Sequence, residues 1–69
     1  MKMLKPGFKF EVVKNGIVGE VGEKCQVRNN EQTYNVLFYE GKIPCYYAEV
    51  FESTIVNNLG LGNYRALDN

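Results

Sequence analysis

The chain has 69 residues, of which 45% are hydrophobic and 23% charged, and eight basic side chains balance eight acidic ones. This composition is typical of one small folded domain and excludes a largely disordered chain. A net charge of zero disfavours nucleic acid as the partner, because counterion release requires a basic surface, although charge gathered on one face would still allow it.

The first half of the chain predicts two strands on either side of a tight turn. Pro6-Gly7 favours a turn, and residues 8–13 then alternate apolar and polar side chains, as a half-buried strand does. Asn15-Gly16 is a strong signal for a second turn. Residues 17–28 are expected to form one long, bent strand, with Gly19 at a bend or bulge.

The second half predicts a hairpin rich in aromatic residues. After a polar loop at residues 29–32, residues 33–39 are rich in β-branched and aromatic side chains and predict the clearest strand. A tight turn at 40–42 leads to a returning strand at 43–47. Pro44 cannot donate a backbone hydrogen bond, which predicts a free edge at that point.

The end of the chain carries weaker patterns. Residues 48–53 lose the alternation, so we expect a single helical or 3₁₀ turn anchored by Phe51, with 3₁₀ favoured, followed by a short fifth strand at 54–56. Beyond this, the sequence predicts a domain boundary, with a barrel over residues 1–58 and a flexible or loosely docked C-terminal tail over residues 59–69.

Five short strands with no helix pattern of ten or more residues predict an all-β fold, a five-stranded barrel. Residues 14–21, Lys-Asn-Gly-Ile-Val-Gly-Glu-Val, are similar to the glycine-x-x-glycine-x-valine centre of KOW motifs. Residues 34–39, Gly41 and residues 47–52 match the later strand pair and the short turn before the last strand. Over residues 5–56 the chain therefore resembles the SH3-like small β-barrels of the KOW and Tudor-like branch, which implies an SH3-like fold.

The side chains that support catalysis are sparse. The sequence has no histidine, which removes the commonest general base and metal ligand. The paired glutamates, Glu20 with Glu23 and Glu49 with Glu52, are expected to be solvated surface charges. We therefore expect no enzymatic activity, no metal or other cofactor and no small-molecule substrate.

Two cysteines, Cys25 and Cys45, are interpreted as free, largely buried thiols in a reducing compartment, with one bridge between neighbouring strands as the alternative. No apolar run approaches the ~20 residues of a membrane span, and no signal-peptide core is present at the N-terminus. These features predict a cytoplasmic protein that does not interact with membranes.

The aromatic hairpin is the candidate site. With a two-residue turn, one face would carry Val36, Phe38, Cys45 and Tyr47 and the other Leu37, Tyr39, Pro44 and Tyr46. A three-residue bulged turn would swap the two sets. Because a barrel wall has only one inner face, the second set is predicted to form an exposed binding patch, rimmed by Lys42 and Arg28. The open alternative is that the tail covers this patch through Leu59, Leu61, Tyr64 or Leu67.

These observations predict a small protein–protein interaction module, acting as an adaptor, an inhibitor or an assembly subunit, whose partner is another protein or a second copy of the chain. We expect such a stand-alone domain to be an accessory protein of a phage or another mobile element. The alternative is a KOW/Tudor-like barrel that binds single-stranded nucleic acid, in which Tyr39 and Tyr46 stack on bases. Its phosphate contacts would be Lys14, Lys24, Arg28 and Lys42.

Overall fold

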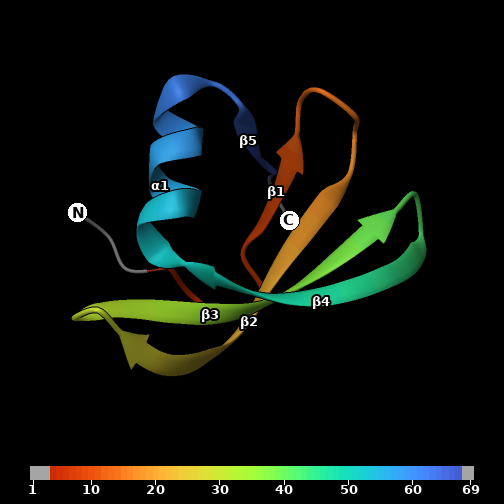
Figure 1. Ribbon diagram of the computed structural model, residues 1–69. Helices are drawn as coiled ribbons and strands as arrows, with labels where there is room; N and C mark the ends of the chain where they lie inside the picture. Colours follow the sequence, from red (N-terminus) through yellow and green to blue (C-terminus); the bar gives the residue numbers. More distant parts are fainter. Residues whose placement is uncertain (1–3, 68–69) are drawn as a thin grey trace.

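The computed structural model of the protein describes residues 4–67, which form five strands and one helix (Figure 1). In chain order these are β1 (Lys9–Val12), β2 (Val18–Arg28), β3 (Glu31–Glu40), β4 (Ile43–Phe51), α1 (Glu52–Leu61) and β5 (Tyr64–Leu67). The prediction of an all-β fold with five strands is confirmed.

The five strands form one antiparallel sheet in the order β4-β3-β2-β1-β5. Strands β4 and β5 are its two edges, and α1 connects them while contacting β3, β4 and β5 (Figure 1). The β2–β3 register shifts twice, between Val21 and Lys24 and between Lys24 and Val27. Such bulges bend a strand, and the resulting curved, open sheet is compatible with a small barrel-like fold.

Both hairpin turns within β2–β4 use two residues with the backbone angles that a twisted hairpin requires. Asn29 and Asn30 have φ angles of 52° and 62°, as in a type I′ turn, and β3 therefore begins at Glu31 rather than at residue 33. Gly41 has a φ of 64° in the turn between Glu40 and Ile43, as in a type II′ turn.

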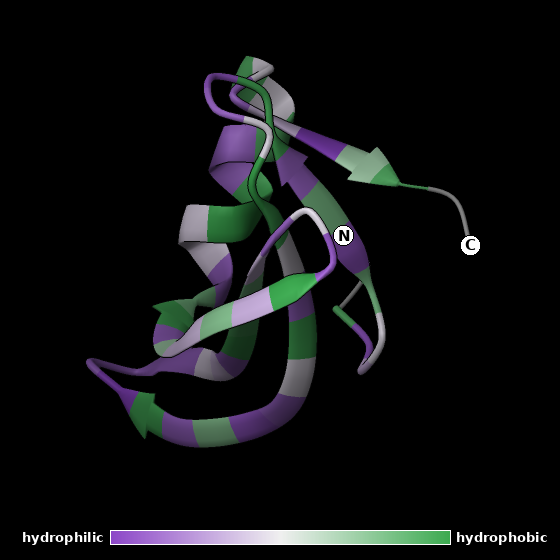
Figure 2. Cartoon of the chain, turned by 90° about the vertical axis from the view of Figure 1, so that its right-hand side faces the viewer, coloured by the Kyte–Doolittle hydropathy of each residue, from purple (hydrophilic) through white to green (hydrophobic). Residues whose placement is uncertain are grey.

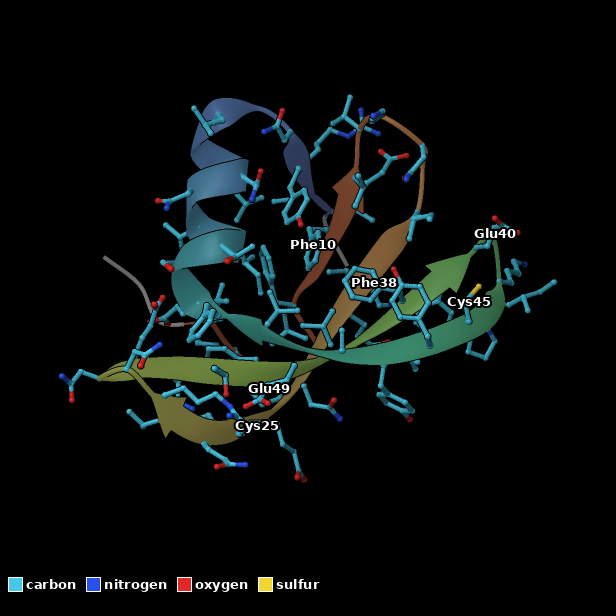
Figure 3. All side chains as sticks on the ribbon, viewed as in Figure 1. Phe10, Cys25, Phe38, Glu40, Cys45 and Glu49 are labelled. Carbon is cyan, nitrogen blue, oxygen red and sulfur yellow. The ribbon has the colours of Figure 1, made fainter. Side chains whose placement is uncertain are left out.

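The sheet turns one apolar face toward α1. The buried apolar side chains belong to β1, β2, β3 and α1, and they are Phe10, Val21, Tyr34, Val36, Phe38 and Ile55. Figure 2 shows hydrophobic and hydrophilic residues alternating along the long strands, and in Figure 3 Phe10 and Phe38 lie on the side that faces α1. The period of two predicted for residues 8–13 thus places Phe10 in the core.

The Phe10 ring is the centre of this core. It stacks on Tyr64 of β5, with 4.6 Å between ring centroids, and meets Phe38 of β3 edge-on at 6.2 Å. Gly19 of β2 pairs with both Phe10 and Phe38 in the sheet. A Cβ atom on Gly19 would lie 2.4 Å from the Phe10 ring, so the ring packs against bare backbone. Gly19 is therefore a packing requirement of the fold.

The single turn predicted for residues 48–53 and the strand predicted for residues 54–56 are wrong. Residues 48–51 continue β4, and the residues from Glu52 onward form the ten-residue helix α1. Ile55, which is fully buried, and Leu59, which packs against the core, are four residues apart and so share one helix face. The β-branched run Thr-Ile-Val favours a strand locally. Burial of Ile55 between the helix and the sheet outweighs that preference.

Both ends of α1 are stabilised by specific hydrogen bonds. At its start, the Glu31 carboxylate of β3 accepts a bond from the Ser53 backbone N–H at 2.8 Å, in place of a cap from the helix itself. At its end, Gly62 has a φ of 84°, and the N–H groups of Gly62 and Asn63 bond to the carbonyls of Leu59 and Asn58. This is the Schellman arrangement, which stops the helix at the glycine.

The predicted tail differs from the structure over most of its length. The division at residue 58 falls inside α1, and residues 64–67 form β5, which pairs with β1 along its whole length. The last strand therefore lies ten residues later than residues 54–56, where it was predicted. Residues 68 and 69 of that tail lie outside the described residues. In residues 4–67, no helix is long and apolar enough to cross a membrane.

Replacing Gly19 with alanine should destabilise the fold by ~1–3 kcal/mol, because the added methyl group overpacks the buried Phe10 ring. Urea unfolding followed by circular dichroism measures the effect. Gly60→Ala is the matched control, since nothing lies within 4 Å of a Cβ at this exposed helix position. Equal stability of the Gly19→Ala and Gly60→Ala proteins would contradict this account of the core.

Candidate functional site

The side of the hairpin that faces away from α1 carries an apolar surface. In the β3–β4 register, Leu37 pairs with Tyr47 and Tyr39 pairs with Pro44, while the neighbouring Phe38 points into the core. We call the surface formed by Leu37, Tyr39, Pro44 and Tyr47 the outer hairpin face. Three of these four residues belong to the predicted patch, and the fourth, Tyr47, replaces Tyr46.

A bulge in β4 explains the exchange of the two tyrosines. Phe38 pairs with Tyr46 and Tyr39 pairs with Pro44, which leaves Cys45 as the extra residue. A bulge reverses the alternation beyond it. Tyr46 therefore lies on the Phe38 side, where the two rings stack with centroids 5.0 Å apart. The predicted division of the hairpin residues between its two faces is wrong for Tyr46 and Tyr47.

The outer hairpin face is open and hollowed. Tyr47 is 67% exposed, whereas Leu37 and Tyr39 are half-buried. One hollow of about 240 Å³ lies between β2 and β4 and includes Glu20, and a second of about 310 Å³ includes Pro44 and the exposed β4 residues. Both hollows are lined by Leu37 and Tyr47, so these two side chains form a ridge between them.

The C-terminal segment does not cover this surface. Tyr64 stacks on Phe10 and Leu59 packs against the same core, so both lie on the inner side of the sheet. Leu61 is 75% exposed on α1, and Leu67 pairs with Lys9 at the edge of the sheet opposite β4. The alternative of a patch hidden beneath the tail is therefore contradicted for residues up to 67.

A hydrogen bond fixes Tyr39 within the face. Its hydroxyl donates to Oε1 of Glu20 on β2 at 3.1 Å. This bond to a carboxylate, together with partial burial and the Glu20 charge, raises the pKa of Tyr39 above its ordinary value. The ring is thus held as a neutral phenol in the wall of the hollow that includes Glu20.

Arg28 and Lys42 do not form a common rim. Arg28 pairs with Glu31 at the start of β3, whereas Lys42 lies in the turn that follows the end of β3. Arg28 Nε donates to Oε2 of Glu49 at 3.1 Å. The same carboxylate oxygen lies 2.7 Å from the hydroxyl of Thr33, which is a buried residue. This hydroxyl has one proton, which it can donate either to Glu49 or to the backbone carbonyl of Gln26.

The four basic residues proposed for nucleic acid are also dispersed. Lys14 lines a hollow near the C-terminal end of α1 with Asn58 and Gly62, and Lys42 lines a different one with Lys9. Arg28 is neutralised by Glu49, and Lys24 is exposed on β2 at the point where this strand pairs with Tyr34. The side chains therefore do not form one continuous basic track.

The thiols are free, as predicted, but they are less buried than predicted. Cys25 is half-buried and Cys45 is exposed, and Figure 3 shows them in different parts of the sheet. Cys45 is exposed because it is the extra residue of the bulge on an edge strand. Within residues 4–67 no group of three or more metal-ligating side chains comes together.

Comparison of the chain with protein-family models, with curated proteins and with solved structures finds no match.

The β4 edge combines exposure with a block to strand pairing. Residues 43–47 are all exposed. In a two-residue hairpin the residues beside the turn exchange both hydrogen bonds, so Glu40–Ile43 is the bonded pair and Tyr39–Pro44 is not. The nitrogen of Pro44 therefore faces the open edge, where proline and the adjacent bulge interrupt the donors that another strand would need.

Replacing Pro44 with valine should make the protein self-associate, because an outward N–H and a β-branched side chain complete the open edge. Sedimentation velocity over a range of concentrations should show dimers or larger species for Pro44→Val but not for Pro6→Val, which changes a proline in an exposed turn. Identical sedimentation of the two variants would show that Pro44 does not protect this edge.

Replacing Glu49 with glutamine should make the free energy of unfolding less sensitive to acidic pH. Hydrogen bonds from Arg28 and then Thr33 lower the pKa of Glu49 below its ordinary value of 4.5. The Glu49 carboxylate therefore binds a proton less readily in the folded state than in the unfolded chain. Its contribution to stability is complete above the ordinary pKa of glutamate and is lost as the pH falls through the lowered pKa of the folded state.

Urea unfolding from neutral pH down to about pH 2 tests this expectation. Glu49→Gln should be less stable than the unmodified protein at neutral pH, and the difference should shrink below about pH 4.5. Glu23→Gln, at an exposed glutamate on β2, should show no such convergence. A stability difference for Glu49→Gln that stays constant with pH would contradict the ion-pair account.

Proposed function

We propose that the protein is a small interaction module, an adaptor, inhibitor or assembly subunit with a binding rather than a catalytic role, and that its outer hairpin face docks on another protein. The observation that carries the proposal is the open ridge of Leu37 and Tyr47 between two hollows. Exposed tyrosines beside half-buried apolar side chains are typical of the centre of a protein interface.

The proposal includes an SH3-like barrel as the architecture of this module. The order β4-β3-β2-β1-β5, with a helical segment leading to a last strand that pairs with β1, is the arrangement expected of that fold. The helical segment here is ten residues long instead of a single turn. Because one fold hosts many functions, the binding role rests on the surface and not on the architecture.

The edge of the sheet favours docking through side chains. A partner that added a strand to β4 would need a regular row of backbone donors. Pro44 and the bulge at Cys45 interrupt that row near the start of β4, within its exposed residues 43–47. The exposed residues of β4 are therefore better suited to contact a partner with their side chains.

The charges on the face favour a protein over single-stranded nucleic acid. Glu20 lines one of the two hollows and accepts a hydrogen bond from the hydroxyl of Tyr39. Glu49 lies on the same side of the sheet. Nucleic acid would meet these carboxylates where it requires cations along its backbone. A protein partner has no such requirement.

Site-specific photo-crosslinking in the cells that produce the protein tests the proposal. A benzoylphenylalanine residue placed at Cys45, which lines the hollow with Pro44 and Tyr47, should give a discrete protein adduct. The adduct should disappear when Tyr47→Ser is added, because this change removes half of the ridge. It should persist with Leu61→Ser, a change of similar exposure on α1.

The outcome depends on the fold being intact, so circular dichroism of the Tyr47→Ser protein accompanies the experiment. An adduct that nuclease removes would support the nucleic-acid alternative and refute the proposal. An adduct that forms equally with Tyr47→Ser and with Leu61→Ser would show that the ridge is not the docking site.

A further inference from the structure

Two lysines converge on a hollow next to the outer hairpin face. Lys9 of β1 and Lys42 of the hairpin turn line a space of about 260 Å³, together with Val18, Tyr39 and Gly41. The two lysines are 33 residues apart in the sequence. They meet because β2 lies between β1 and β3 in the sheet, so that one wall of the hollow comes from each side of β2.

Neither lysine has an acidic partner within residues 4–67. The two ion pairs of this part of the chain use Arg28 with Glu49 and Arg65 with Glu11. Glu20 pairs with Lys9 in the sheet register. Its carboxylate, however, accepts a hydrogen bond from the Tyr39 hydroxyl, and Glu20 lines the neighbouring hollow that contains Leu37 and Tyr47. The lysine hollow therefore holds two positive charges without a compensating carboxylate in its wall.

The lysine hollow continues into the proposed docking surface. Tyr39 lines both this hollow and the one that contains Leu37 and Tyr47. A partner segment that lies across the ridge would pass the Tyr39 ring and then reach the two ammonium groups. Complementarity requires an apolar side chain at the ridge and a negative charge at the lysines.

We propose that the lysine hollow binds a side-chain carboxylate of the partner, so that the outer hairpin face recognises a segment with an apolar residue followed closely by an acidic one. This inference rests on the proposed function and names the chemistry of its partner. The hollow is smaller than the ~300–1,000 Å³ typical of small-molecule sites, and its size suits a single side chain. Lysine ammonium groups bind a carboxylate as point charges, with no need for the planar geometry of arginine.

A phosphate chain fits the same surface less well. Two lysines neutralise only two charges. Lys14 lines a different hollow, and Arg28 is paired with Glu49. A nucleic acid that continued past Tyr39 would bring its phosphates close to the negative charge of Glu20. We therefore favour an acidic peptide, and make an oligonucleotide one arm of the test.

The experiment titrates the isotope-labelled protein with three blocked tripeptides and follows its amide resonances by NMR. The probes are N-acetyl-Phe-Gly-Glu-amide and its counterparts ending in glutamine and lysine, each added to about 20 mM because millimolar affinity is expected. The glutamate peptide should give saturable shifts at residues 9, 37, 39, 42 and 47 and should bind tightest. Its advantage over the glutamine peptide should decrease as salt is raised from about 0.02 to about 0.2 M.

Variants separate the lysines from general electrostatics. Lys9→Gln and Lys42→Gln should each weaken binding of the glutamate peptide about two- to fivefold, as expected for exposed ion pairs. The double variant should bind the glutamate and glutamine peptides equally. Lys14→Gln removes the same charge at a different hollow and should leave the affinity unchanged.

The outcomes distinguish this inference from the proposed function. Equal affinity for all three peptides, with saturable shifts at residues 37 and 47, would overturn the carboxylate site and leave the apolar docking surface intact. No saturable shift from any peptide would also overturn the inference, while photo-crosslinking would still decide the proposed function. Octathymidylate is the oligonucleotide arm of the same titration. If it binds more tightly than the glutamate peptide, and this binding is lost in the double lysine variant, both the carboxylate site and the proposed function are overturned.

Discussion

The contact between the Phe10 ring and the backbone of Gly19 joins the two halves of the sheet. Through this ring, β1 packs on β2, meets β3 at Phe38 and holds β5 at Tyr64. Strand β1 has only four residues, and so does β5, the edge strand that pairs with it. So short a strand gains little from its ladder hydrogen bonds alone. The aromatic cluster provides the apolar burial that keeps β5, and with it the end of α1, on the sheet.

The helix shows how tertiary contacts override local preference. Residues 54–56 have the side chains of a strand, yet they lie in α1 because Ile55 fills the space above the curved sheet. The helix begins beside Glu31, which is far from it in sequence, and ends at Gly62. The glycine and the i, i+4 spacing of Ile55 and Leu59 were readable signals for this helix. The contribution of Glu31 was not, because it depends on where β3 starts.

The bulge at Cys45 determines which side chains reach the candidate interaction surface. It moves Tyr46 onto Phe38 and turns Tyr47 outward, and the same segment places Pro44 at the open edge. One irregularity therefore sets both the apolar ridge and the protection of the edge from strand pairing. The lysine hollow arises in a similar way, since Lys9 reaches the hairpin only through the order of the strands.

The sequence by itself determined the features that depend on neighbouring residues. The alternation around Phe10, the turn residues Asn15-Gly16 and Gly41, and the apolar character of both hairpin faces were all visible in it, because period and turn geometry are local properties. Tertiary structure alone decided the register past Cys45, the start of the helix beside Glu31, and the pairing of β5 with β1. Each of these is settled by contacts with residues distant in the chain, which no local pattern records.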